Sequence, residues 1–213
     1  MRLTSIVGPQ SGSPRWSPDS KKIVFDSRPG AKAAVFVVGA EGGPVTRLTP
    51  DDVDAYLPTW SHDGRWIYFT SNRDGAPKRW RMPAEGGPAE KITTQRTVFG
   101  EETPDQKYLV YIASRALWRQ PLGGDKSEKV LEHLDWREFV PAEKGMYFIE
   151  RTAQPMQQVE YLDYVTQQRR PVATIGPRPN HTGTMAVSPD RKWLLFDRTD
   201  QANIEIMLVE NFR

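Results

Sequence analysis

The stretch WSHDGRWIYFTSNRDG, residues 60–75, holds a short apolar run between two Asp-Gly pairs. Asp-Gly is typical of tight turns, because the Asp side chain bonds the nearby backbone and glycine tolerates left-handed dihedral angles. The run between the pairs, WIYFTS, is rich in aromatic and β-branched residues, as β-strands are. The stretch therefore predicts a strand enclosed by two tight turns.

The same pattern recurs along the chain. It returns as WSPDSKKIVFDS from Trp16, ETPDQKYLVYIAS from Glu102 and VSPDRKWLLFDR from Val187, with a weaker copy, FVPAEKGMYFIE, from Phe139. The last aromatic residue of each copy marks its position: Phe25, Phe69, Tyr111, Phe148 and Phe196. Successive markers are 44, 42, 37 and 48 residues apart. A period of roughly 40 to 45 residues is typical of propeller blades with four strands each.

Each repeat also contains a third strand, such as AVFVVGA at 34–40, and a short fourth one, such as VTRLT at 45–49. The last repeat stops after its third strand, whereas residues 2–4 repeat the Arg-Leu-Thr of a fourth strand. We therefore predict an all-β fold, a β-propeller of about five four-stranded blades in which the N-terminal strand, residues 2–6, completes the C-terminal blade.

The predicted domain is a single propeller spanning residues 1–213. Its blades are expected at about 13–50, 56–94, 98–132, 135–175 and 182–210. The alternative is a piece of a longer repeat array. The protein is then a monomer if five blades close, and an oligomer if the chain is a fragment of a larger ring.

Composition excludes several classes of protein. The chain has no cysteine, so disulfides and thiolate metal sites are ruled out. Its 29 basic and 27 acidic residues nearly balance, which gives no general attraction to nucleic acid. It has no apolar run of about 18 residues, so membrane insertion is not expected. The start of the chain is too poor in apolar residues to be a secretory signal, which leaves the compartment undetermined.

The repeated core W-S-P-D-G-x-x-I-Y-F-x-S, followed by G-G-x-x-x-x-L-T, resembles the PD40 (WD40-like) repeats of TolB-type β-propellers. The closing run IMLVENFR also resembles the ends of larger bacterial proteins that carry such repeats. The resemblance implies a propeller that binds other proteins, and a periplasmic location by analogy with TolB. It carries over no catalytic residue, because the shared motif consists of turn and core positions.

One aspartate recurs in the turn of four repeats and could be mistaken for an acid catalyst or a calcium ligand. We expect these residues to form turns instead. They are Asp19, Asp63, Asp105 and Asp190.

A second recurring position is expected to pack between neighbouring blades. Trp16, Trp60, Phe139 and Val187 occupy it. Glu102 holds this register in the third repeat, where it is either exposed or paired.

Two regions are candidates for binding a partner. The first is the residue that directly precedes this recurring position in the first strand of each repeat. These residues are mostly polar, which suits a water-filled channel, and they either pair with one another or contact a ligand. The second is the set of loops between repeats, where aromatic and arginine residues are typical of binding surfaces. The candidates are Arg15, Glu101 and Glu138 in the strands, and Asp54, Tyr56, Trp136, Arg137, Arg178 and His181 in the loops.

Other chemistry finds little support in the sequence. The three histidines fall in different repeats without metal-ligand spacing, and no G-x-S-x-G motif occurs, so no metal, cofactor or catalytic residue is predicted. The basic run 78–81 is interpreted as a half-buried strand with Arg79 and Arg81 on its charged outer side. Nucleic acid is therefore not an expected partner.

The preferred hypothesis is a non-catalytic propeller that serves as a scaffold for protein–protein interaction or sensing. One alternative is a carbohydrate- or peptide-processing enzyme, or its gating domain, that acts at the channel mouth. Another is a propeller that binds a small ligand or a metal ion.

Overall fold

The computed structural model describes residues 3, 10–134, 138–149, 156–177, 185–188, 192–200 and 203–210. Every regular element within these ranges is a β-strand, so the all-β prediction is confirmed. Accordingly, the described part of the chain has no helix that could span a bilayer.

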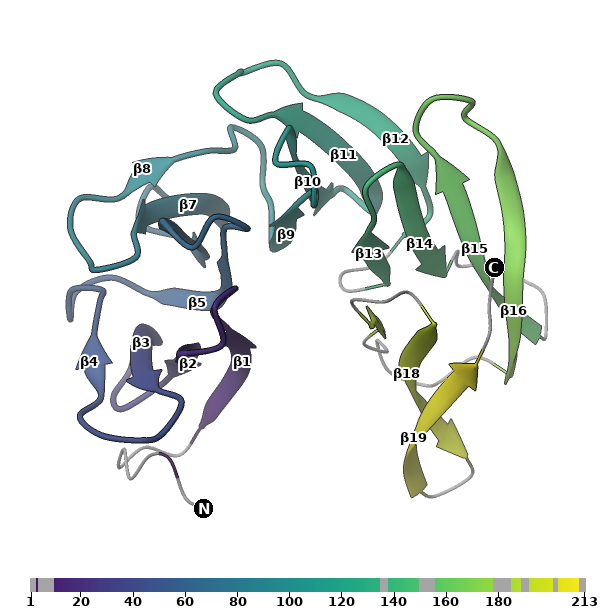
Figure 1. Cartoon of the computed structure of the whole chain (residues 1–213). Helices are drawn as coiled ribbons and strands as arrows, with labels where there is room; N and C mark the ends of the chain where they lie inside the picture. The colour runs from purple at the N-terminus through teal and green to yellow at the C-terminus, as the bar shows by residue number, and fades with distance from the viewer. Residues whose placement is uncertain are drawn as a thin grey trace. The chain divides into compact units, whose positions relative to one another are not determined.

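The strands form five sheets, each a meander in chain order (Figure 1). The first sheet consists of β1 (Ser11–Trp16), β2 (Lys22–Ser27), β3 (Ala34–Gly39) and β4 (Thr46–Arg47). The second consists of β5 (Ala55–Trp60), β6 (Trp66–Ser71), β7 (Lys78–Pro83) and β8 (Glu90–Lys91). The third consists of β9 (Phe99–Glu102), β10 (Tyr108–Ala113), β11 (Ala116–Pro121) and β12 (Glu128–Glu132). The fourth consists of β13 (Phe139–Pro141), β14 (Gly145–Ile149), β15 (Met156–Asp163) and β16 (Arg169–Pro177). The fifth consists of β17 (Met185–Val187), β18 (Trp193–Asp200) and β19 (Asn203–Glu210).

The structure thus contains four complete four-stranded blades, not the five predicted, and one three-stranded sheet. Among the described residues the fifth repeat forms three strands. The segment predicted to supply a fourth strand, residues 2–6, lies outside the described residues apart from Leu3. Leu3 packs against the apolar cluster of the first sheet that contains Phe25 and Phe36.

The chain divides into two compact units. One comprises Met1–Glu102 with Pro121–Lys126, and the other Thr103–Gln120 with Ser127–Arg213. The first two sheets therefore lie wholly in the first unit, which holds most of the contacts described below.

The repeated Asp turn is built from a fixed set of hydrogen bonds. In the second sheet the Ser61 hydroxyl donates to Asp63 Oδ1 at 2.7 Å, and the Arg65 backbone N–H donates to the same oxygen at 3.0 Å. The Trp66 backbone N–H donates to Ser61 Oγ at 2.9 Å, which starts β6. Gly64 adopts the left-handed conformation that this turn requires, with φ of 72°.

The first and third repeats build the same turn. Ser17 donates to Asp19 and Thr103 donates to Asp105, each at 2.6 Å. These bonds confirm the structural role predicted for the aspartates at 19, 63 and 105, while Asp190 lies outside the described residues.

An apolar cluster holds the first two sheets together. The first sheet contributes Val24 and Val35, both fully buried, and the second contributes Ile67, Phe69 and Met82. Burying a side chain of this kind stabilises the fold by about 1.5–3 kcal/mol. Because successive residues of a strand point to opposite faces, each sheet has a second apolar face that needs its own cover.

The tryptophan that ends the first strand of each of the first two sheets is packed in one sheet and exposed in the other. Trp60 packs against the shared cluster, and its indole N–H donates to the Arg15 carbonyl oxygen of the first sheet at 3.1 Å. Packing between sheets is therefore confirmed for Trp60. Trp16, at the same register of the first sheet, is 58% exposed, so the prediction fails for Trp16 in the described structure. No preceding repeat among the described residues supplies its carbonyl partner.

Glu102, the departure from this register, is buried and paired. Its carboxylate accepts the Tyr68 hydroxyl at 2.5 Å and the His62 backbone N–H at 2.9 Å. Burial and the adjacent carboxylate raise the pKa of the Tyr68 phenol, so this group stays a protonated donor. A glutamate thus reaches back to the preceding sheet, as Trp60 does.

The turn bonds predict an acid-sensitive contribution from Asp63. Burial acts to raise the pKa of this carboxyl, but hydrogen bonds from Ser61 and from the Arg65 backbone and guanidinium lower it to about 2, against an ordinary value of 3.8. Since the folded-state pKa is depressed, the stabilisation is complete above pH of about 4 and is lost as the pH falls towards about 2.

We expect Asp63→Ala to lower the free energy of unfolding by about 1–2 kcal/mol near pH 6, and the difference from wild type to shrink at low pH. Urea titrations at several pH values measure this. Asp125→Ala, in the exposed turn between β11 and β12, serves as control and should change stability by less than about 0.5 kcal/mol. An equal loss in both variants would contradict the assignment.

Candidate functional site

The connections of a meander alternate between its two ends, because consecutive strands run in opposite directions. In the first two sheets the longer connections share one end, which we call the loop end, and the tight turns share the other, the turn end. The loop end comprises residues 28–33, 48–54, 72–77 and 92–98. The turn end comprises residues 17–21, 40–45, 61–65 and 84–89.

Asp54 ties the loops at the loop end together. Its carboxylate accepts the Ala33 backbone N–H at 2.8 Å and lies 3.8 Å from the Arg28 guanidinium. Lys32 bonds the Asp52 carbonyl oxygen close by. The connection between β2 and β3 is therefore joined to the start of the second sheet.

Tyr56 is half-buried at the start of β5, next to Asp54, and not in the loop predicted from the sequence. Burial, and then the Asp54 carboxylate, raise the pKa of the Tyr56 phenol. Arg28 and Arg96 act on the same phenol in the opposite sense. The structure thus brings the two predicted loop residues together beside two arginines.

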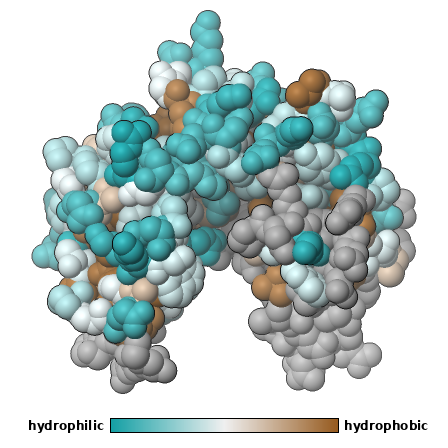
Figure 2. Space-filling model, in the orientation of Figure 1, coloured by the Kyte–Doolittle hydropathy of each residue, from teal (hydrophilic) through white to brown (hydrophobic). Residues whose placement is uncertain are grey.

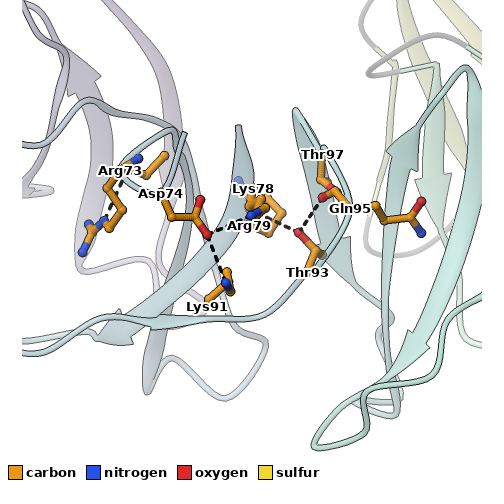
Figure 3. Close-up of polar contacts among 9 residues, drawn as sticks. Arg73, Asp74, Lys78, Arg79, Lys91, Thr93, Gln95 and Thr97 are labelled. Carbon is orange, nitrogen blue, oxygen red and sulfur yellow. Dashed lines mark hydrogen bonds and ion pairs between the residues drawn. The ribbon is translucent and has the colours of Figure 1, made fainter. Parts of the chain in front are cut away.

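A second cluster of charge belongs to the second sheet (Figure 3). Asp74 Oδ2 accepts hydrogen bonds from Lys78 Nζ at 2.8 Å and from Lys91 Nζ at 3.0 Å. These two bonds lower the pKa of the Asp74 carboxyl, which keeps it ionised. One carboxylate therefore orients two ammonium groups.

Arg73 lies next to this cluster and stacks on aromatic rings. Its guanidinium carbon is 4.6 Å from the Trp80 ring centroid and 5.4 Å from that of Phe69. Partial burial lowers the pKa of Arg73, but an arginine stays protonated at neutral pH. The rings restrict the plane of the guanidinium, and its Nε donates to Ser71 Oγ at 3.4 Å.

Arg79 is wholly buried and joins three strands to β7. Its Nη1 donates to the Leu57 carbonyl oxygen at 2.9 Å and to Thr70 Oγ1 at 3.3 Å. Its Nη2 donates to Thr59 Oγ1 and to the Gly100 carbonyl oxygen, both at 2.8 Å. Burial lowers the pKa of this guanidinium. The side chain thus fastens β5 and β6 to β9.

The prediction that Arg79 lies on the charged outer side of its strand is therefore wrong. Arg81, on the same face, keeps 23% of its side chain exposed, as predicted, and pairs with Glu90. Met82 is buried on the opposite face. A strand pattern cannot reveal that a polar face meets another sheet.

The first-strand candidates Arg15 and Glu101 are brought together, with Arg15 Nη2 3.9 Å from Glu101 Oε1. Of the two readings left open for these residues, the structure favours mutual pairing. Glu138 is buried at the start of β13, where its carbonyl oxygen accepts the Ile149 backbone N–H at 2.9 Å.

Four loop candidates lie outside the described residues: Trp136, Arg137, Arg178 and His181. Within the described ranges, no three His, Asp or Glu side chains gather as they would around a metal ion. A hollow of about 400 Å³ opens at the loop end. It is lined by Pro29, Gly30, Ala31, Lys32, Arg47 and Asp51.

Sequence reasoning missed the cluster of Arg73, Asp74, Lys78 and Lys91, and it missed Arg96. The signal that could have found them is present in the sequence, because the order of strands in a meander already assigns every connection to one end. Counting the charges of each end, with the strand residues that flank the connections included, would have drawn attention to these residues.

Repeated four-stranded meanders, three of which contain the same Asp turn, define the class of β-propeller proteins. The model of the PD40 family, described as the TolB β-propeller domain, matches residues 3–132. The chain belongs to this family. No curated protein sequence matches the chain.

Solved structures agree on the fold. TolB from Acinetobacter baumannii is 17% identical, with a TM-score of 0.79 over 95% of this chain and 52% of that one. An oligogalacturonate lyase from Vibrio parahaemolyticus is 13% identical, with a TM-score of 0.65 over 93% and 62% of the two chains. A puromycin-hydrolyzing peptidase of Mycobacterium tuberculosis is 10% identical, with a TM-score of 0.66 over 93% and 35%.

At these identities the similarity shows the fold alone. The chain spans about half the length of the TolB structure and about a third of the peptidase.

The bonds of Arg79 predict that its guanidinium cannot be replaced by an ammonium group. Arg79→Lys keeps the charge but cannot reach all four acceptors, and the buried carbonyl groups lose their donors. We expect the free energy of unfolding to fall by about 2–4 kcal/mol in urea titrations. Arg65→Lys, whose side chain is 77% exposed, should change it by less than about 0.5 kcal/mol. A similar small change in Arg79→Lys would show that the buried bonds contribute little.

Proposed function

We propose that this protein is a TolB-like propeller that acts as a non-catalytic scaffold for binding another protein. The observation that carries the proposal is that the two ends of the sheets use their polar residues differently. The repeated polar residues are engaged in turn bonds at one end. The residues that vary between repeats gather at the loop end, where Asp54, Tyr56 and Arg73 present charged and aromatic groups of the kind that protein interfaces use.

The proposed scaffold is a ring of five sheets that the N-terminal strand completes. Two exposed residues support this proposal. Trp16 is 58% exposed, although Trp60 at the same register reaches a carbonyl group of the preceding sheet. Leu195 is 41% exposed in the last sheet, although Val24 at the same register is fully buried by the following sheet. In the proposed ring, each of these exposed residues faces the sheet at the other end of the chain.

If the ring closes, Trp16 of the first sheet is expected to contact Ala186 of the last sheet. Trp16 occupies the repeat position of Trp60, and Ala186 occupies that of Arg15, whose carbonyl oxygen accepts the Trp60 indole N–H. The chain lacks cysteine, so Trp16→Cys with Ala186→Cys gives a clean crosslinking pair. We expect a short bismaleimide to join them within one chain, as it should join the control pair Arg15→Cys with Trp60→Cys.

Crosslinks between chains, together with an oligomeric solution mass, would instead mean that several chains complete the ring. A control pair that reacts while the test pair does not would refute closure altogether.

A second candidate function is an enzyme, or the gating domain of one, because the solved structures with this fold include a lyase and a peptidase. Those proteins act on oligogalacturonate and puromycin by name, and this chain has only the fold in common with them. Turnover of an oligogalacturonate or peptide panel by the folded protein would favour this candidate over the scaffold.

The scaffold proposal predicts a partner that depends on the loop end. We expect the immobilised protein to retain a partner from an extract of its source cells, and free protein to compete for it. Arg28→Gln combined with Tyr56→Phe should weaken retention by about tenfold, since the partner loses an arginine and a hydroxyl contact. Quantitative mass spectrometry of the eluates measures the loss.

The matched control is Lys21→Gln combined with Glu41→Gln at the turn end, which should retain the partner like wild type. Circular dichroism checks that both variants fold. Retention of no protein by the folded wild type, or equal loss in both variants, contradicts the proposal.

A further inference from the structure

The two ends of the first two sheets differ in charge, although the whole chain is nearly neutral. The loop-end surface is defined here as the loop-end connections together with the one strand residue that flanks each of them on either side, and it carries seven basic side chains and four carboxylates, a net charge of +3. Its charged residues are Arg28, Lys32, Arg47, Asp51, Asp52, Asp54, Arg73, Asp74, Lys78, Lys91 and Arg96. Counted in the same way, the turn end carries three basic side chains and five carboxylates, a net charge of −2. These are Asp19, Lys21, Lys22, Glu41, Asp63, Arg65, Glu85 and Glu90.

The basic groups of the second sheet are held in place before any partner arrives. Asp74 orients Lys78 and Lys91, and two aromatic rings orient Arg73. Binding therefore costs less side-chain entropy than it would for free lysines and arginines. Arg96, on the connection that follows β8, is exposed at the same end.

We propose that the loop-end surface of the first two sheets binds an acidic segment of a partner protein. The partner's carboxylates contact the basic side chains around Asp74, and the planar guanidinium of Arg73 takes one carboxylate by two parallel hydrogen bonds. This inference rests on the proposed scaffold function and names the chemistry of the partner.

A protein segment fits the surface better than a nucleic acid does. The carboxylates at 51, 52 and 54 lie at the same end as the basic cluster, where they repel an unbroken run of phosphates but leave room for acidic residues spaced by neutral ones. A net charge of +2 for the whole chain is also small for a protein that binds nucleic acid.

The partner is expected to bind through polar contacts. On the face drawn in Figure 2, hydrophobic residues form small, separate patches among hydrophilic ones. Association driven by charge is also sensitive to salt, because exposed charges are screened beyond about 10 Å at 0.1 M ionic strength.

The test uses fluorescence anisotropy with the full chain and three labelled probes. The probes are a peptide of alternating glutamate and serine, the same peptide with glutamine for glutamate, and a single-stranded DNA oligonucleotide of similar charge. We expect the wild type to bind the glutamate peptide and not the glutamine one, and to weaken several-fold as NaCl rises from about 50 to about 300 mM.

A triple variant with a matched control locates the site. Arg73→Gln, Lys78→Gln and Arg96→Gln together should weaken binding of the glutamate peptide by about tenfold or more. Lys21→Gln, Lys22→Gln and Arg65→Gln together remove the same charge from the turn end and should leave binding within about twofold. Should the first triple variant fail to fold, the exposed Arg96→Glu replaces it and should weaken binding several-fold.

Four results overturn the inference. These are no binding of the glutamate peptide at low salt, equal binding of the glutamine peptide, equal losses in the two triple variants, and tighter binding of the DNA. The captured partner separates this inference from the function on which it rests. A partner that is retained equally by wild type and by the loop-end triple variant leaves the scaffold standing and refutes the acidic docking surface, whereas the absence of any partner refutes the scaffold.

Discussion

A four-stranded meander with apolar residues on both faces is stable only when another sheet covers each face. This constraint shapes the first two sheets, where Val24 and Val35 on one side meet Ile67, Phe69 and Met82 on the other. The indole N–H of Trp60 adds a polar contact to the same boundary. The contacts across it explain why the chain repeats a unit of about forty residues, since a single unit cannot bury both of its faces alone.

Polar side chains also form hydrogen bonds between neighbouring sheets, in which most of their donors and acceptors have partners. The carboxylate of Glu102 takes the place that a tryptophan holds in the preceding repeat, and it is satisfied by Tyr68 and a backbone N–H. Arg79 donates to two carbonyl groups and two threonines without touching a carboxylate. Removing one partner of such a bond leaves the other buried and unsatisfied, which destabilises the fold.

The scaffold and the candidate binding surface are built from different residues. Turn residues such as Asp63 are engaged by their own backbone and are thereby committed to the fold. At the opposite end Asp54 also accepts a backbone N–H, whereas Arg73 is exposed and stacks on the rings of Trp80 and Phe69.

The sequence by itself determined the all-β fold, the repeat and the Asp turns, because turn chemistry and strand patterning are local and recur in every unit. It also placed Asp54 in a connection between sheets, but it assigned Tyr56 to the same loop, whereas this residue lies in β5. Only the tertiary structure decided that Arg79 is buried, that Glu102 is paired and that Trp16 is exposed, because each of these depends on whether a neighbouring sheet covers the residue. The pattern of a strand indicates which residues share a face, but only the packing of the sheets determines which residues that face contacts.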